Sequence, residues 1–411
     1  MRFSTLEVRI ALLGMGVRVV LYLVLLASAG GQTHKVSRDS EALHYRAMEI
    51  AIDYGNGLTD WGQLIDNAWP LVVGILYYYT TPSLLLVVGI SAVASGISIV
   101  LTYRIALMVT SNRLVAAAAG YTVALFPSAV FFQCLPIKES VAMLSILWVA
   151  WGLLRMRLQR DAGAVKWILL GTLVIIGLRV YLAPILIYCV ALTLLMRGGR
   201  SIAAAIAQLT IWSVFLVVAA QLSFDLGGLD WRQIRAFEYL DMERLNTVRG
   251  SLARGTGAFV NRHSYSRQYA FGNSLANDVF LLGTGVYYFL IGIDFFNVRS
   301  TRQWAAVPEA LVVLFCLPYM FVGVRSLWRY HRTAAVPILI ITVALFTVYG
   351  AGTTNMGAMY RWRLQAMPFL AMTIYLGAAH WRRGPVFALL KIVRNQLPRR
   401  RFAPVFEGPP R

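Results

Sequence analysis

The stretch SRDSEALHYRAMEIAIDYGNGLTDWGQLID, residues 37–66, interrupts an otherwise apolar chain. It holds six of the eighteen acidic residues of the protein and directly follows a hydrophobic segment. After Asp39 the apolar residues recur at helical spacing, at Ala42, Leu43, Ala47, Ile50 and Ala51. We therefore predict a short amphipathic helix that lies on the membrane surface, with Asp39 at or near its N-cap.

The composition around this stretch is that of a polytopic membrane protein. Of 411 residues 58% are hydrophobic and only 14% are charged, whereas a soluble chain of this length needs more polar surface. The formal net charge is +20, but most basic residues lie in short stretches between apolar segments, where the positive-inside rule accounts for them. Membrane lipids are therefore the expected surroundings, and nucleic acid is not an expected partner.

Apolar segments long enough to span a bilayer predict an all-α fold with about ten transmembrane helices, within a range of nine to thirteen. The expected spans are 10–29, 82–108, 114–132, 139–156, 165–181, 182–197, 202–222, 304–324, 333–351 and 362–381. Two shorter apolar segments, 68–79 and 278–295, are predicted to be interfacial or re-entrant helices of the outer loops. Residues 1–381 then form one transmembrane domain, and 382–411 form a basic, Pro-rich cytoplasmic tail.

The basic clusters predict the orientation. They fall on one side if both termini are cytoplasmic, which makes this a multi-pass protein of the cell (inner or plasma) membrane. Residues 30–66 and 223–303 are then outer loops. Seven arginines between 224 and 274 depart from the rule, but long loops translocate largely regardless of charge, and their role stays open.

The first candidate site is the carboxylate pair Asp39 and Glu41 beside the first span. Such groups on the outer face of a membrane enzyme would act as a general base or hold a divalent cation. The structural alternative is a helix cap and a solvated acid. We interpret Asp39 and Glu41 as catalytic candidates, with the need for a metal left open.

Cations at the outer ends of other spans predict an anion-binding site. Lys138 and Glu139 follow two prolines in FPSAVFFQCLPIKES, residues 126–140, where an ordinary helix-pair turn is the alternative interpretation. Arg179, Arg361 and Arg363 also lie in or beside apolar segments, where an unpaired charge costs roughly 2.5–3.5 kcal/mol. Because guanidinium forms fork-like hydrogen bonds to phosphate oxygens, these residues are substrate-binding candidates for a lipid phosphate.

This layout resembles the GT-C superfamily of integral-membrane glycosyltransferases, mainly over residues 8–200. The matching features are Arg18 in the first span, an acidic and aromatic first outer loop, Trp69-Pro70, the Phe126-Pro127-Ser128 turn followed by Glu139, and Arg179 after the next span. The resemblance implies a polyprenyl-phosphate-linked sugar as substrate, Asp39 as catalytic base and Tyr45 in substrate binding. One departure is that Ser40 separates the two acids, which are adjacent in many members.

Three functions compete. The first is a glycosyltransferase that moves a sugar from a polyprenyl-phosphate-linked donor to an extracytoplasmic glycan, lipid or protein acceptor. The second is an O-antigen-type polysaccharide polymerase, indicated by the arginine-rich loop 224–274 and by AMYRWRLQAMP, residues 358–368. The third is a non-enzymatic lipid-linked-glycan transporter or flippase, although no repeat relates the two halves. We expect the first, because an acidic first loop suits a general base.

Overall fold

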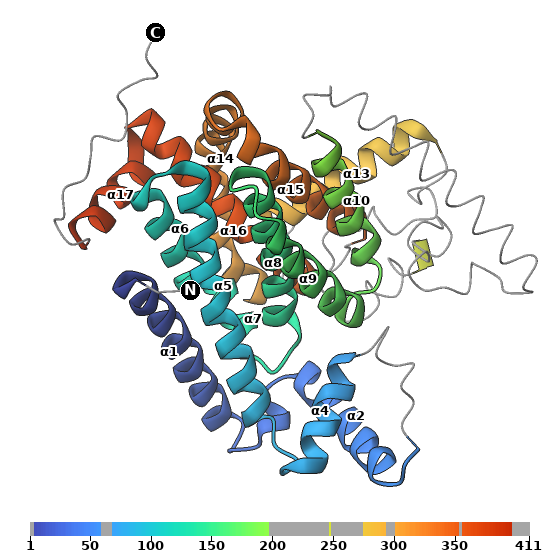
Figure 1. Ribbon diagram of the computed structural model, residues 1–411. Helices are drawn as coiled ribbons and strands as arrows, with labels where there is room; N and C mark the ends of the chain where they lie inside the picture. Colours follow the sequence, from blue (N-terminus) through green and yellow to red (C-terminus); the bar gives the residue numbers. More distant parts are fainter. Residues whose placement is uncertain are drawn as a thin grey trace, which may run out of the picture.

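The structure is a computed structural model that describes residues 4–58, 68–196, 246–247, 274–292, 301–352 and 356–396 (Figure 1). Every regular element in these ranges is a helix. Five helices are long and apolar enough to cross a membrane, namely α1 (Thr5–Ser28), α5 (Leu85–Thr110), α8 (Glu139–Leu158), α14 (Thr301–Tyr330) and α15 (Arg332–Gly352). A sixth crossing arises if α6 (Arg113–Leu125) and α7 (Pro127–Cys134), bent by 52° at their junction, count as one span. The protein is a helical membrane protein.

The remaining apolar helices are shorter than a full crossing. They are α4 (Ala68–Tyr79), α9 (Val165–Leu178), α10 (Leu182–Leu195) and α13 (Leu275–Ile291). At 1.5 Å per residue a helix of 14 residues is about 21 Å long, less than the roughly 30 Å of bilayer hydrocarbon. Among the described residues, length and composition alone therefore support five or six crossings, and this count does not test the ten that were expected, because the expected span 202–222 lies outside these residues.

Helix α16 (Met356–Trp381) lies inside the bundle and packs against α14, α6, α8 and α15. From Arg363 to Ala378 every residue except Ile374 is buried. Polar residues such as Gln365 and Thr373 lower its hydropathy, and it is not among the candidate spans. A helix covered by protein does not need a uniformly apolar surface, because its polar groups bond to neighbouring helices rather than face lipid.

Glycines allow a close helix contact within the bundle. At the crossing of α14 and α16, a Cβ on Gly323 would overlap the carbonyl of Thr373, and one on Gly377 would overlap the carbonyl of Tyr319. Small residues let two membrane helices approach to backbone contact, where dispersion and weak hydrogen bonds replace the missing hydrophobic drive. This crossing holds the C-terminal half of α16 against α14.

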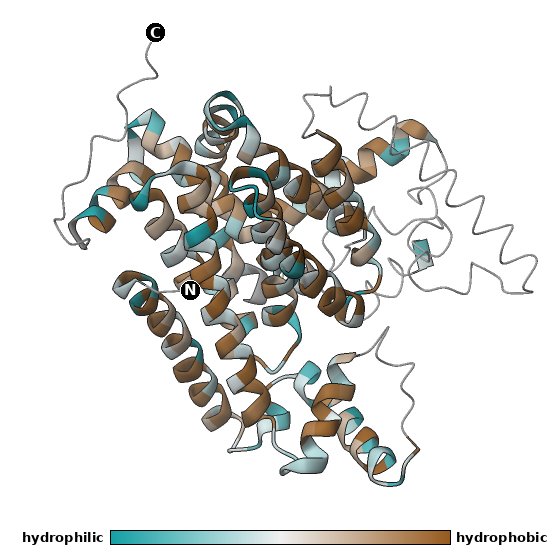
Figure 2. Ribbon diagram, viewed as in Figure 1, coloured by the Kyte–Doolittle hydropathy of each residue, from teal (hydrophilic) through white to brown (hydrophobic). Residues whose placement is uncertain are grey.

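The amphipathic helix expected after the first span is α2 (Arg38–Gly55), which packs with α4 beside the C-terminal end of α1 (Figure 1). Its apolar positions Leu43, Ala47 and Ile50 are buried. Figure 2 shows the mixed colouring of α2 against the mainly hydrophobic α1 and α5. At the other end of the chain, α17 (Gly384–Gln396) packs on α16 and α6, so the first part of the expected tail is helical; residues 397–411 lie outside the described ranges.

Candidate functional site

The start of α2 places Asp39 at the membrane end of the first loop. The N-cap is Ser37, whose Oγ accepts a hydrogen bond from the N–H of Ser40 at 3.1 Å. Asp39 is the second residue of the helix, so its charge also interacts favourably with the positive end of the helix dipole. Its side chain is 57% exposed, which leaves the carboxylate accessible to a substrate.

Asp39 forms an ion pair with Arg361 of α16, a residue 322 positions away in sequence. One Nη of Arg361 donates to a carboxylate oxygen of Asp39 at 2.5 Å. The Arg361 side chain is 25% exposed. The structure thus joins the first loop to the AMYRWRLQAMP segment, two regions that the sequence analysis singled out for different functions.

A buried ion pair lies near this exposed one. Glu139, the first residue of α8, accepts two hydrogen bonds from one Nη of Arg179, at 2.6 and 2.8 Å. Both side chains are almost fully buried. The other Nη of Arg179 donates to the Tyr181 hydroxyl at 2.6 Å, and the Gln365 amide donates to Glu139 at 3.3 Å. Desolvation makes an unpaired charge costly here, so these partners are required for Glu139 and Arg179 to stay charged.

Aromatic rings fix the orientation of the Arg179 guanidinium. Its Cζ lies 5.3 Å from the ring centre of Trp362 and 5.8 Å from that of Tyr349. The Tyr349 hydroxyl donates to Gln365, which in turn bonds Glu139. Cation–π contacts strengthen when water is excluded, so this layer is a rigid support beneath Arg361 rather than an open site.

Lys138 is a third cation, near Arg361 and Arg179. It directly precedes α8, and its Nζ donates to the carbonyl of Leu178 at 2.8 Å. Burial, together with the nearby charges of Arg179 and Arg361 and against the opposing charge of Glu139, lowers the pKa of Lys138 to about 8. These interactions place Lys138 in the same neighbourhood as Arg361.

The charges of this group do not cancel. Three cations, Lys138, Arg179 and Arg361, face two carboxylates, Asp39 and Glu139, which leaves one net positive charge at neutral pH. We call these five residues the outer charge cluster, after the side of the membrane on which the sequence is expected to place them. The Nη groups of Arg179 are already bonded to Glu139 and Tyr181, whereas Arg361 and Lys138 have further N–H groups. The arrangement suits an anion bound beside an accessible carboxylate.

Glu41 and Tyr45 face other directions than Asp39. Residues two and six positions apart on a helix are about 200° and 240° apart around its axis. Among the described residues Glu41 makes no ion pair, and Tyr45, 54% exposed, packs edge-on against His44 with ring centres 5.6 Å apart. His44 is held by the Tyr77 hydroxyl at 3.0 Å from Nδ1, and its pKa is lowered by burial and by His34. The two expected carboxylates therefore do not converge.

Arg363 lies apart from the outer charge cluster. It pairs with Glu309 of α14, donates to the carbonyl of Leu290 at 3.0 Å and lies 4.5 Å from the ring centre of Tyr360. Two positions separate it from Arg361, so it faces nearly the opposite side of α16. The structure gives Arg363 an internal partner. The sequence analysis did not identify Glu309, although an acid within the apolar segment 304–324 is itself a signal of a buried pair.

Arg18 holds the break between α6 and α7. Pro127 has no N–H, so the carbonyl of Val123 loses its helix partner, and one Nη of Arg18 donates to it at 2.8 Å. The N–H of Ser128 bonds Glu309 at 3.0 Å, which frees the carbonyl of Ala124 for the other Nη of Arg18, also at 2.8 Å.

The remaining Arg18 donors are used as well. They bond the carbonyl of Gly14 and, twice, the Oε1 of Gln133. The guanidinium is fully buried with all five N–H groups paired. Arg18 is therefore a structural clamp, and Gln133, an isolated amide in an apolar segment, is a second residue that the sequence analysis did not identify.

Among the described residues, no three His, Cys, Asp or Glu side chains come together as a metal site. No family model matches the chain, and no curated protein and no solved structure matches it. The GT-C resemblance therefore stays a prediction from the sequence, and the geometry of the outer charge cluster has to carry the functional argument.

Proposed function

We propose that the protein is an integral-membrane glycosyltransferase that moves a sugar from a polyprenyl-phosphate-linked donor to an extracytoplasmic glycan, lipid or protein acceptor. The observation that carries this proposal is the contact between Asp39 and Arg361. It pairs an accessible carboxylate with a cation that has N–H groups to spare. A base beside a phosphate-binding group is the arrangement that sugar transfer from a lipid phosphate requires.

In the proposed reaction Asp39 accepts the proton of an acceptor hydroxyl. The hydroxyl oxygen forms a bond to the anomeric carbon of the sugar while the bond from that carbon to the phosphate oxygen breaks. The electron pair leaves with polyprenyl phosphate, whose developing charge Arg361 and Lys138 stabilise. Glu139 and Arg179 position Arg361 from its buried side and take no part in bond making.

The same proposal includes the finer architecture. About ten crossings in a GT-C-like order would need the short helices α9 and α10, the buried α16 and the segment 202–222 to complete the set. Both termini would be cytoplasmic in the inner or plasma membrane, with α2 lying over the substrate on the outer side. The short helix pair α9 and α10 supports this order, since the break between them places Arg179 at the outer charge cluster.

A polysaccharide polymerase is the second candidate. Its support is that Arg361, part of the AMYRWRLQAMP segment, contacts Asp39 directly. Both enzymes would then use one site and differ in product. A transferase adds one sugar, whereas a polymerase yields a ladder of lengths.

The test is turnover of the purified full chain in liposomes with a panel of short polyprenyl-phosphate monosaccharides, measured as release of polyprenyl phosphate. Asp39→Asn should lower the rate about 10²- to 10⁴-fold, because an amide cannot accept the proton. Asp53→Asn, at the far end of the same helix, is the matched control and should keep the wild-type rate. Normal turnover by Asp39→Asn, or no release from any lipid, would refute the proposal.

A further inference from the structure

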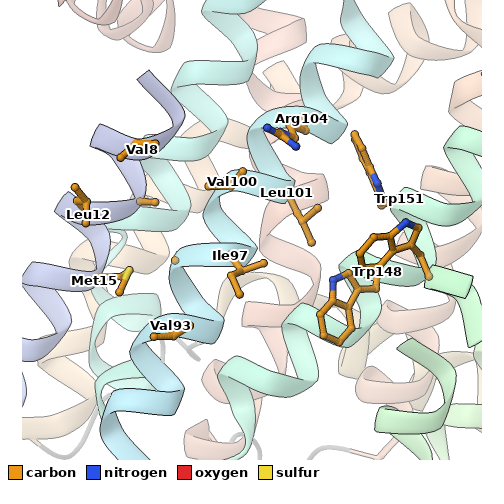
Figure 3. Close-up of a pocket in the computed structure, with 13 residues that line it drawn as sticks. Val8, Leu12, Met15, Val93, Ile97, Val100, Leu101, Arg104, Trp148 and Trp151 are labelled. Atoms are coloured by element: carbon orange, nitrogen blue, oxygen red, sulfur yellow. The ribbon is translucent and has the colours of Figure 1, made fainter. Parts of the chain in front are cut away.

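An apolar groove runs along α5 at the opposite end of the bundle from Asp39. Its volume is about 280 Å³, close to the lower bound of roughly 300 Å³ for ligand pockets. Figure 3 shows Val8, Leu12 and Met15 of α1 on one side of α5, and Trp148 and Trp151 of α8 on the other. This size and lining fit a single hydrocarbon chain rather than a whole lipid.

The groove lies in the half of the membrane that faces away from the outer charge cluster. Met15 is thirteen residues before the end of α1, about 20 Å along the helix, and Asp39 follows beyond that end. Trp151 is twelve residues from Glu139 on α8, about 18 Å. This placement argues against a lipid whose phosphate lies beside Asp39 as the occupant of the groove.

Two cations lie beside the tryptophans that line one side of the groove. Arg155 lies 6.0 Å from the ring of Trp151, and the Nζ of Lys166 lies 5.7 Å from the ring of Trp167, which also lines the groove. Arg155 pairs with Asp161 at 2.5 Å, whereas Lys166 is exposed and makes no ion pair with any described residue.

Arg104 stands at one end of the row of groove side chains on α5 and pairs with Glu7 (Figure 3). Counting Glu7, Arg104, Arg155, Asp161 and Lys166, this end carries one net positive charge. An apolar groove lined on one side by tryptophans, with an excess cation beside them, matches an acyl chain with an anionic headgroup.

We propose that this groove binds one anionic membrane phospholipid, with an acyl chain along α5 and its phosphate near Lys166. The site is separate from the proposed transferase site and does not depend on it. The groove side chains of α1 and α5 are open on the side that a membrane covers, for example Leu12 (60% exposed) and Ile97 (42% exposed), so a chain enters from the bilayer.

The test is native mass spectrometry of the purified full chain titrated with phosphatidylglycerol or phosphatidylcholine. Wild type should retain one phosphatidylglycerol and bind phosphatidylcholine more weakly. Ile97→Trp on α5 and Leu12→Trp on α1 fill the groove from two of its helices and should each lower retention at least tenfold. Leu23→Trp, an exposed position in the other half of α1, is the matched control and should keep the lipid. Thermal unfolding confirms that each variant is folded.

Lys166→Gln tests the headgroup. It should weaken phosphatidylglycerol binding about fivefold, the ratio that corresponds to about 1 kcal/mol per basic residue, and leave phosphatidylcholine unchanged. Equal retention by the groove-filling variants and wild type would overturn the proposal. So would equal binding of the two phospholipids, or displacement of phosphatidylglycerol by short polyprenyl phosphate at equal concentration.

Discussion

Two groups of charged residues in this protein use arginine in opposite ways. At the break between α6 and α7, which we call the helix-break cluster, Arg18, Glu309 and Arg363 are buried and turn toward protein partners. In the outer charge cluster, Arg361 contacts a carboxylate that is 57% exposed, and one positive charge remains in excess. Full pairing marks a structural role, because no N–H group of Arg18 is left for a ligand. Exposure and excess charge mark a binding role.

The structural role of Arg18 in the helix-break cluster predicts a measurable loss of stability when this residue is replaced. Arg18→Leu leaves the carbonyls of Val123 and Ala124 without a donor, because both lost their helix partners at the break. The carbonyl of Gly14 keeps its hydrogen bond within α1, and the Oε1 of Gln133 keeps the Ser95 hydroxyl at 3.0 Å. At about 1–3 kcal/mol for each of the two unsatisfied carbonyls, the loss is about 2–6 kcal/mol. We expect thermal unfolding in detergent to shift strongly downward, or folded protein to be lost on extraction.

Arg9→Leu on the same helix is the control, since Arg9 is exposed and should tolerate the change. If Arg18→Leu were as stable as Arg9→Leu while donor binding fell, Arg18 would belong to the substrate site. That outcome would break the distinction between the two clusters.

Much of the fold was accessible from the sequence, because bilayer length and helical periodicity are local properties. Those signals predicted the helices at α1, α5, α8 and α15, and the burial of Leu43 and Ala47 on α2. The number of crossings was less accessible. Hydropathy does not distinguish a helix that faces lipid from one covered by protein, and the apolar segments of α9 and α10 form helices too short to cross by themselves.

The site was accessible only in part. Asp39, Lys138 and Arg179 stand out because charge beside an apolar segment is costly, but their partners depend on which helices meet. Arg361 reaches Asp39 across 322 positions, a pairing that no local pattern encodes. Arg361 and Arg363 were grouped by position, although a separation of two residues already places them on different faces.

The neighbours Arg361 and Arg363 give the sharpest comparison of the clusters. Arg363→Leu leaves Glu309 buried without its cation and should cost about 3–5 kcal/mol of stability. Arg361→Leu removes a partly exposed pair and should cost about 1 kcal/mol or less. Thermal unfolding of the two variants measures the difference.

A double variant tests whether the loss of stability comes from the uncompensated charge of Glu309 or from the lost shape of the Arg363 side chain. Glu309→Gln added to Arg363→Leu removes the uncompensated charge and keeps an oxygen for the N–H of Ser128, so most of the stability should return. Equal stability of the two single variants would mean that Arg361 is as structural as Arg363.

The binding role of Arg361 predicts the reverse order in ligand affinity. Arg361→Ala should weaken binding of a short polyprenyl phosphate by about 1.5–3 kcal/mol, roughly 10- to 150-fold, the range for a hydrogen bond to a charged group. Acceptor binding should change less. Isothermal titration of the full chain in detergent measures the loss, and an unchanged affinity would remove Arg361 from the phosphate site.

The smallest predicted effect concerns pH and Lys138. Burial lowers its pKa to about 8, so the folded protein loses this proton at lower pH than the unfolded chain. The unfolded chain then binds more protons above pH 8, and this group makes stability rise with pH from about 8 toward the ordinary pKa of lysine.

Phosphate binding should follow the opposite course, because the Lys138 charge is present below pH 8 and lost above it. Between pH 7 and 9 the charged fraction falls about tenfold, which limits the loss of polyprenyl phosphate affinity to about tenfold. Lys138→Arg keeps its charge over this range and should flatten the profile. A flat profile in wild type would place Lys138 with the structural charges, and the outer charge cluster would then bind its anion through Arg361 alone.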